Sequence, residues 1–233
     1  DGRFIAYLAG RQMAPQEIAT AETFLGKLAQ LYVIPVEGGE AKQLTDLAGG
    51  VQGHSWSPDG HTIAFTTLVN PELGLESAKL ASQEDLYQKY NQDVLVANRV
   101  RWKSDALGFV GDYYRHIAKL NFNGDNTGAA QPVLLTAGTS DFNSPTWSPD
   151  GKHLAIAGNI HAEAEWQRKS FAYLLDASAN SPTEPKEICG LEEMRSGDLA
   201  FSPDGSTLAV CGHDNPIKGH YGLQKLWLIS VAD

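Results

Sequence analysis

The chain has 233 residues, of which 42% are hydrophobic and 20% charged, with a formal net charge of −10. This composition is typical of a globular protein, and the negative balance argues against nucleic acid or an anionic membrane surface as a partner. No apolar run approaches the roughly 18 residues of a transmembrane helix, and no signal peptide is visible. The two cysteines, Cys189 and Cys211, are too few for a disulfide framework, so we expect reduced thiols and a cytoplasmic location.

One phrase recurs along the chain. It reads DGRFIAYLAG at 1–10, SWSPDGHTIAFTT at 55–67, TWSPDGKHLAIAG at 146–158 and AFSPDGSTLAVCG at 200–212. A degenerate copy, RWKSDALGF at 101–109, lies in the longest gap. The five copies place an aspartate at Asp1, Asp59, Asp105, Asp150 and Asp204. Spacings of this size are typical of the WD-like repeat of a β-propeller, in which each blade has four antiparallel strands.

The phrase itself predicts a β-hairpin. In Ser-Pro-Asp-Gly, proline presets φ, aspartate can bond its own backbone, and glycine accepts the left-handed conformation. The complete turn pairs are Asp59-Gly60, Asp150-Gly151 and Asp204-Gly205. An aromatic residue precedes each turn and each degenerate turn, at Trp56, Trp102, Trp147 and Phe201. After the turn, large apolar residues alternate with alanine, as expected of a strand in a sheet that is packed on both faces.

Two more strands are expected in each blade. The third contains Tyr32, Tyr173 or Trp227, and the fourth lies at 40–45, 131–136 or 185–189. The predicted fold is therefore all-β, a partial β-propeller of about four to five four-stranded antiparallel blades with both ends truncated. We place the blade hairpins near 1–9, 54–67, 99–111, 145–157 and 199–211, all within one propeller fragment that spans 1–233.

Two segments interrupt the blade pattern. An insertion covers 70–92, and in it Ser82 and Asp85 fit a capping box for a short helix at 83–90. This insertion is either a substrate-facing lid or a solvated flap over a sheet edge. The segment 14–28 is another loop with helical character.

The segment 93–124 carries a family resemblance. It reads DVLVANRVRWKSDALGFVGDYYRHIAKLNFNG and resembles the segment between two propeller blades in the acylaminoacyl-peptidase branch of the prolyl oligopeptidase family. Ala106 replaces the turn glycine, and Ala118 stands where that family usually has an aromatic residue. The resemblance implies a non-catalytic propeller that covers a C-terminal α/β-hydrolase domain of the same polypeptide and restricts its active site to short peptides.

Substrate-binding residues follow from the same resemblance and from the charges. In the dipeptidyl-peptidase branch a propeller glutamate pair clamps the substrate amine, and Glu192 with Glu193 is such a pair here; the alternative is a solvated connection between blades. Arg99 and Arg101 flank one residue of a predicted strand, either as ligands of a substrate carboxylate or as structural partners of acidic loops.

No catalytic residue is expected in this chain, because it lacks the Gly-x-Ser-x-Gly motif of a nucleophile elbow. Cys211 and His213 have no partner cluster at metal spacing, so we expect no metal and no cofactor. The predicted function is the gating propeller of a serine peptidase, and a homo-oligomer is left open. The first alternative is a stand-alone binding propeller like the Tol-Pal translocation protein. A glycan-acting propeller ranks last, because in its Asp box the aromatic residue follows the glycine.

Overall fold

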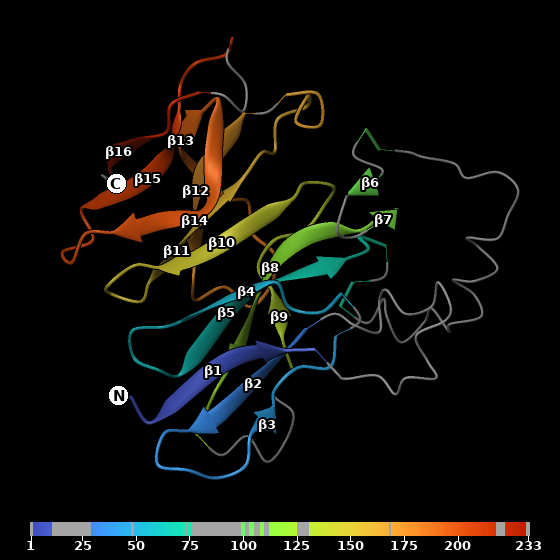
Figure 1. Ribbon diagram of the computed structural model, residues 1–233, viewed down its shortest axis with the longest axis vertical. Helices are drawn as coiled ribbons and strands as arrows, with labels where there is room; N and C mark the ends of the chain where they lie inside the picture. Colours follow the sequence, from blue (N-terminus) through green and yellow to red (C-terminus); the bar gives the residue numbers. More distant parts are fainter. Residues whose placement is uncertain are drawn as a thin grey trace, which may run out of the picture.

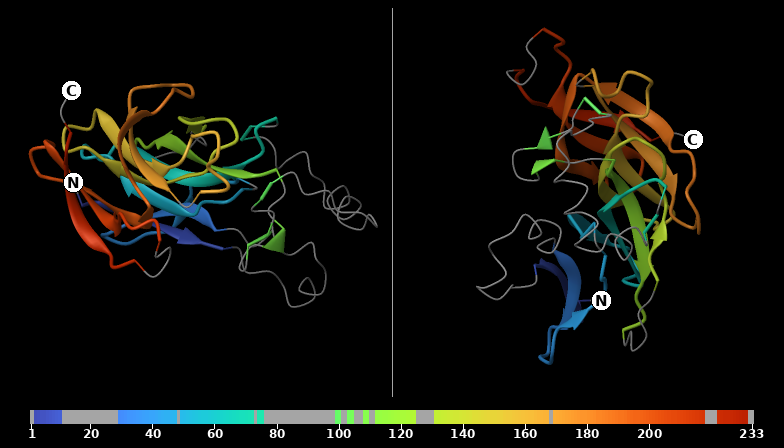
Figure 2. Two further views of the ribbon diagram at one scale, coloured as in Figure 1. Left: turned by 90° about the horizontal axis from the view of Figure 1, so that it is seen from above. Right: turned by 90° about the vertical axis from the view of Figure 1, so that its right-hand side faces the viewer.

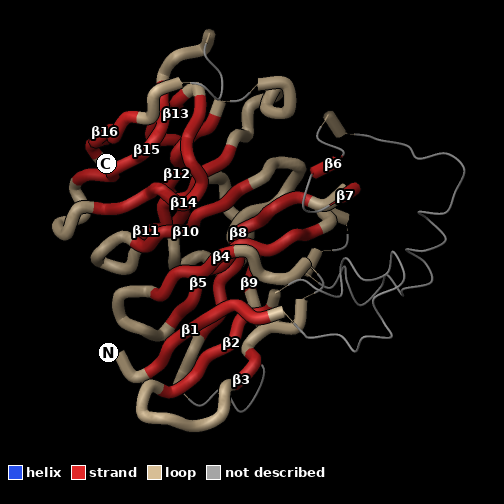
Figure 3. Tube along the Cα trace, viewed as in Figure 1, coloured by secondary structure: helices blue, strands red, loops and turns tan. Residues whose placement is uncertain are grey.

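The computed structural model is built from strands and loops (Figures 1 and 3). It describes residues 2–10, 29–47, 49–72, 74–75, 99–100, 103–104, 108–109, 112–124, 131–167, 169–217 and 222–231. No helix appears among these residues, so none of them forms a helical segment able to cross a membrane. The predicted helix at 83–90, the loop at 14–28, and the residues Asp1, Arg101, Trp102, Asp105 and Ala106 lie outside this description.

Four antiparallel sheets follow one another in chain order, and we number them as blades 1 to 4 (Figure 1). Blade 1 contains β1 (Phe4–Ala9), β2 (Gln30–Pro35) and β3 (Lys42–Gln43). Blade 2 contains β4 (Gly53–Trp56), β5 (Thr62–Val69), β8 (Tyr114–Asn121) and β9 (Val133–Leu134). Blade 3 contains β10 (Phe142–Trp147), β11 (His153–Gly158), β12 (Ser170–Asp176) and β13 (Lys186–Leu191). Blade 4 contains β14 (Glu193–Phe201), β15 (Thr207–His213) and β16 (Lys225–Ser230).

The degenerate copy of the phrase does not open a blade of its own, and this corrects the sequence analysis. Among the described residues, its strands β6 (Lys103–Ser104) and β7 (Gly108–Phe109) pair with each other in a separate two-stranded sheet. Strand β8 pairs with β5 over eight residues, from Thr62↔Asn121 to Val69↔Tyr114. The physical reason is burial, because both long strands are almost entirely buried and complete blade 2 together.

The Ser-Pro-Asp-Gly turns close the first hairpin of blades 2, 3 and 4 in one way. In blade 2 the Ser57 hydroxyl donates to Asp59 Oδ1 at 2.5 Å, and the backbone N–H of Thr62 donates to Ser57 Oγ at 2.9 Å. Gly60 has φ of 74°, and the turn glycines of the other two blades have nearly the same value. Only glycine adopts this left-handed conformation without strain, which explains its place in the phrase.

The blades pack large face on small face. Ile63 and Phe65 of β5 lie in one buried cluster with strand β2 of blade 1, whereas Ala64, between them in sequence, faces blade 3. The next blade repeats this order, since Leu154 and Ile156 share a cluster with Ala64. The alternation predicted from the sequence therefore sets the stacking direction, and the small alanine face lets the following blade approach.

The outer blades each leave one face uncovered. In blade 4 the side chains of Leu226 and Leu228 are 70% and 69% exposed, and in blade 1 Ile5 is 54% exposed. Figure 2 shows the same stacking of sheets from two further directions. At the position equivalent to Ile5, blades 2, 3 and 4 have Ile63, Leu154 and Leu208, and these three side chains are fully buried.

Candidate functional site

The two ends of the strands differ in character. The three Ser-Pro-Asp-Gly turns lie together at one end, along the left edge of Figure 1, and β6 and β7 lie at the other. At the turn end, neighbouring blades meet through the phrase itself. A side chain built on Gly151 would contact Pro58 at 3.8 Å, and one on Gly205 would contact Pro149 at 3.6 Å.

The turn aspartates accept hydrogen bonds that stabilise the backbone of the turns. The pKa of Asp204 is lowered to about 2, first because the Ser202 hydroxyl donates to it and then because the backbone N–H of Ser206 does so. The pKa values of Asp59 and Asp150 are lowered for the same two reasons. These carboxylates are therefore ionised at neutral pH and hydrogen-bonded within their own turns.

The aromatic residues of the phrase also act as packing groups. Trp147 is half-buried, and its indole Nε1 donates to the carbonyl oxygen of Ser55 in the preceding blade at 3.0 Å. Trp56 meets Phe122 edge to face, with ring centroids 5.3 Å apart. Phe201 packs against the cluster between blades 3 and 4.

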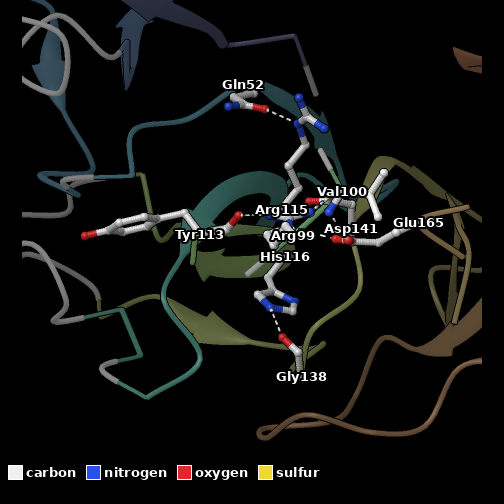
Figure 4. A network of polar contacts seen from close by, with 9 residues as sticks. All are labelled: Gln52, Arg99, Val100, Tyr113, Arg115, His116, Gly138, Asp141 and Glu165. Atoms are coloured by element: carbon white, nitrogen blue, oxygen red, sulfur yellow. Dashed lines mark hydrogen bonds and ion pairs between the residues drawn. The ribbon is translucent and has the colours of Figure 1, made fainter. Parts of the chain in front are cut away.

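The opposite end holds a charged network centred on Arg99 (Figure 4). The Arg99 side chain is 5% exposed, and its Nε donates to Glu165 Oε1 at 2.8 Å while Nη2 donates to Asp141 Oδ2 at 2.9 Å. Its Nη1 donates to the carbonyl oxygen of Tyr113. The guanidinium also lies 3.9 Å from the centre of the Tyr114 ring, a cation–π distance.

This network joins three parts of the chain. Arg99 precedes blade 2's third strand, Asp141 directly precedes β10, and Glu165 lies in the loop between β11 and β12. Glu165 also accepts from the backbone N–H of Val100 at 2.8 Å. Burial alone would lower the pKa of Arg99, but the hydrogen bond that it donates to Glu165 and the charge and hydrogen bond of Asp141 outweigh burial and raise the pKa. Arg99 is therefore a permanently charged clamp that holds residues 99–100 against blade 3.

A cavity of about 560 Å³ opens beside the clamp. Arg99, Arg115, Asp141, Glu165, Trp166 and Glu193 are among its lining residues. Trp166 is 79% exposed at this place, so a large aromatic surface stands next to charged groups.

The structure separates the predicted glutamate pair. Glu192 Oε1 lies 3.5 Å from Lys169 Nζ, whereas Glu193 Oε2 lies 3.2 Å from Nε2 of the buried His213. Of the two, Glu193 lines the cavity beside Arg99. The two glutamates therefore have different partners, and Glu193 shares a cavity with Arg99. The other predicted arginine, Arg101, is outside the described residues.

A hydroxyl–imidazole contact occurs inside blade 2. His116 Nδ1 lies 3.1 Å from Thr136 Oγ1, and His116 Nε2 lies 3.1 Å from the carbonyl oxygen of Gly138. Both side chains are 1% exposed, and Thr136 Oγ1 also accepts from the backbone N–H of Ile117 at 2.9 Å. Burial lowers the pKa of His116. No substrate can reach this pair, so its role is to hold the loop that follows β9.

The sequence did not reveal the partners of Arg99 in the charged network. Asp141 and Glu165 lie 42 and 66 residues from Arg99 in sequence, so no local spacing links them. The notable signal was the Arg115-His116 pair, which the resemblance singled out only as a marker of the segment. Arg115 joins the network through its backbone N–H, which donates to Asp141 Oδ1 at 2.8 Å.

The stacked antiparallel sheets define a β-propeller fold. No family model matches the chain. The chain is 29% identical over 175 residues to an uncharacterized peptidase, YuxL, of Bacillus subtilis, and covers 23% of that protein. Its fold is similar to the Pyrococcus horikoshii acylaminoacyl peptidase, with a TM-score of 0.57 and 13% identity over 99% of this chain and 30% of that one. It is equally similar to a putative TolB from Agrobacterium tumefaciens, with a TM-score of 0.56 and 13% identity over 99% of this chain and 58% of that one.

These similarities confirm the predicted resemblance. The chain is a partial β-propeller similar to the propeller side of peptidases of the acylaminoacyl and prolyl oligopeptidase type. It spans less than a third of the length of the two peptidases.

Proposed function

We propose that this chain is the non-catalytic propeller part of a cytoplasmic serine peptidase, and that it gates the active site of a C-terminal α/β-hydrolase domain of the same polypeptide. The observation that carries this proposal is the sequence similarity to a peptidase more than four times as long as the part matched, at 29% identity. The described residues agree with a non-catalytic role, because their hydroxyl–imidazole pair of Thr136 and His116 is closed to substrate.

The proposed filter works by exclusion. Sheets stacked face to face with buried clusters between them form a rigid wall, and a wall excludes folded proteins without any specific contact. The net charge of −10 adds an electrostatic bias against acidic substrates, but that field is screened within about 8 Å at physiological salt. Sterics should dominate, so the substrates are short peptides at low and at high salt.

The test compares two substrates of the longer protein that contains this chain. We expect cleavage of a short chromogenic peptide and sparing of fluorescent casein, with the same ratio at both salt concentrations. Deleting 147–157, which removes most of the first hairpin of blade 3, should relax the size limit. Equal digestion of casein by the intact protein, or loss of exclusion at high salt, contradicts the filter.

Two controls keep this experiment informative. The deletion variant must still cleave the short peptide, which shows that the hydrolase domain has folded. A fluorophosphonate probe should label the longer protein and leave the 233-residue chain unlabelled. Labelling of a serine within 1–233 contradicts the assignment of catalysis to another domain.

A binding module is the second candidate function. The observation that favours it is the similarity to the putative TolB, whose TM-score matches that of the peptidase. In this case the longer protein would show no probe labelling and no peptide cleavage, and would instead retain a protein partner on its propeller.

A further inference from the structure

A second cavity, of about 550 Å³, lies between the first strands of blades 2 and 3. Its lining includes Gln52, His54 and Ser55 from blade 2, and residues 143–146 from blade 3. Arg115 lines both this cavity and the one beside Arg99. We call it the interblade cavity.

The Arg115 guanidinium is held in place through one of its three nitrogens. Its Nε donates to Gln52 Oε1 at 2.9 Å, and its backbone N–H is bound to Asp141. In the described part of the chain, Nη1 and Nη2 have no hydrogen-bond partner. Figure 4 shows the guanidinium beside Gln52 and turned away from the carboxylates of Asp141 and Glu165. A guanidinium fixed at Nε presents its two terminal nitrogens as a planar fork, which matches the two oxygens of a carboxylate.

The charge around this fork is one-sided. No acidic side chain is among the described residues that line the interblade cavity, although the whole chain carries a net charge of −10. Both oxygens of Asp141, which holds the Arg115 backbone, are engaged by Arg115 N and Arg99 Nη2. Burial lowers the pKa of His54, so its ring is neutral at pH 7. Arg115 therefore has no counterion among the described residues of the interblade cavity, whereas the other cavity that it lines also contains Asp141, Glu165 and Glu193.

A polar donor and a strained residue stand across from it on blade 3. The Asn143 Oδ1 accepts from the Ser144 hydroxyl at 3.0 Å, and the Asn143 amide nitrogen has no partner in the residues that the structure describes. Ser144 has φ of 59°, which makes it the non-glycine residue with a left-handed backbone in those residues. Such strain is concentrated at ligand-binding positions of proteins.

We propose that the interblade cavity binds the C-terminal carboxylate of a peptide, with Arg115 as its bidentate ligand and the Asn143 amide as an additional donor. This proposal rests on the proposed function, because it takes a peptide as the molecule that is admitted. A carboxylate fits better than a phosphate, since one guanidinium meets one negative charge and the acidic chain repels a second. Arg115 would then favour peptides that present a free C-terminus.

The test measures binding to the 233-residue chain by titration calorimetry. The probes are an N-acetylated tripeptide with a free carboxylate, the same tripeptide as its amide, and inorganic phosphate. We expect the free acid to bind and the amide to bind roughly ten- to a hundredfold more weakly, the range of one charged bidentate contact. Arg115→Met should abolish this difference, and Arg115→Lys, which keeps the charge but loses the fork, should reduce it.

Lys152→Met is the matched control, because it removes the same charge from a side chain that is 76% exposed at the turn end. It should bind both peptides as the unchanged protein does, and melting curves must show that the Arg115 variants remain folded. Equal binding of the acid and the amide, no binding of either, undiminished preference in Arg115→Met, or phosphate binding tighter than the acid each overturns the carboxylate site. None of these results bears on the proposed exclusion of large substrates, which the casein assay on the longer protein tests separately.

Discussion

The two ends of the blades differ in how they use charge. At the turn end, three aspartates each accept hydrogen bonds within their own turn, and the turn glycines of blades 3 and 4 lie close to the proline of the preceding turn. At the other end, Arg99 binds carboxylates from two distant loops, and Nη1 and Nη2 of Arg115 have no partner among the described residues. The charged groups of the turn end are therefore hydrogen-bonded within their own turns, whereas the other end offers the guanidinium of Arg115 to a ligand.

This difference teaches where to look for function in a repeat protein. The repeated phrase supplies the two features that the blades share, namely a tight turn and an aromatic residue that packs between blades. Arg99 and Arg115 each occur once, outside the common phrase, so they can be specialised for a ligand without affecting the other blades. The predictions below separate the two ends by asking which substitutions change stability and which change peptide binding.

The largest expected effect is on stability, from Trp147→Ala at the turn end. This change removes a half-buried aromatic side chain and leaves the Ser55 carbonyl oxygen without its indole donor. We expect a loss of about 3 kcal/mol in the free energy of unfolding, at the lower limit for aromatic-to-alanine changes because Trp147 is not fully buried. Urea unfolding measures it, and peptide binding should stay unchanged under folding conditions.

The matched control for that change is Trp166→Ala. Trp166 is 79% exposed, so its removal should alter the free energy of unfolding by no more than about 0.5 kcal/mol. A similar loss in both variants would remove Trp147 from the packing between blades.

A smaller loss is expected from Arg99→Met at the other end. Breaking a buried ion pair usually costs about 3–5 kcal/mol because one charge remains unpaired. Here the carboxylates of Asp141 and Glu165 are 23% and 27% exposed, so water can solvate them and we expect about 2 kcal/mol. Unlike Trp147→Ala, this variant should also weaken peptide binding, because Arg99 helps to fix Asp141, which in turn binds the backbone N–H of Arg115.

Lys152→Met serves as the control for Arg99→Met, since it removes an exposed charge that binds only its own turn. Unfolding in urea and calorimetric titration should give unchanged values for it. An Arg99→Met protein with normal stability and normal binding would mean that the clamp holds nothing in place.

The smallest expected effect is on the stability of the chain at acidic pH. The folded-state pKa values of the turn aspartates are lowered, to about 2 for Asp204, so their contribution to stability is present above the unfolded value near 4 and is lost as the pH falls toward 2. Melting temperatures between pH 5 and pH 2 should therefore fall less steeply for Asp204→Asn than for the unchanged chain. Parallel curves for the two proteins would contradict this origin of the acid sensitivity.

The sequence predicted the repeated end well, because its physics is local. The turns, the alternation around Ala64 and Ala155, and the strands around Tyr173 and Trp227 all follow from residues within a few positions of one another. The same reasoning failed at 101–109, where a phrase-like hairpin was taken for a blade. Local pattern could not show that β5 would pair across the gap with β8.

The other end could not be predicted, because its contacts are long-range. Arg99 was singled out from sequence, but its partners Asp141 and Glu165 could be identified only in three dimensions. Arg115 was noticed as part of a resemblance, and its unused donors emerge only once Gln52 and Asp141 are known to hold it.

A photo-crosslinking experiment tests the contrast between the two ends most directly. The probe is an N-acetylated tripeptide with a free C-terminus and a benzophenone side chain, and mass spectrometry of the digested chain maps its attachment. Our account predicts labelling at 139–146 and 163–167, which flank the two cavities, and loss of that labelling in Arg115→Met. Labelling at the turns 57–60, 148–151 or 202–205 would place the ligand at the repeated end and contradict the account.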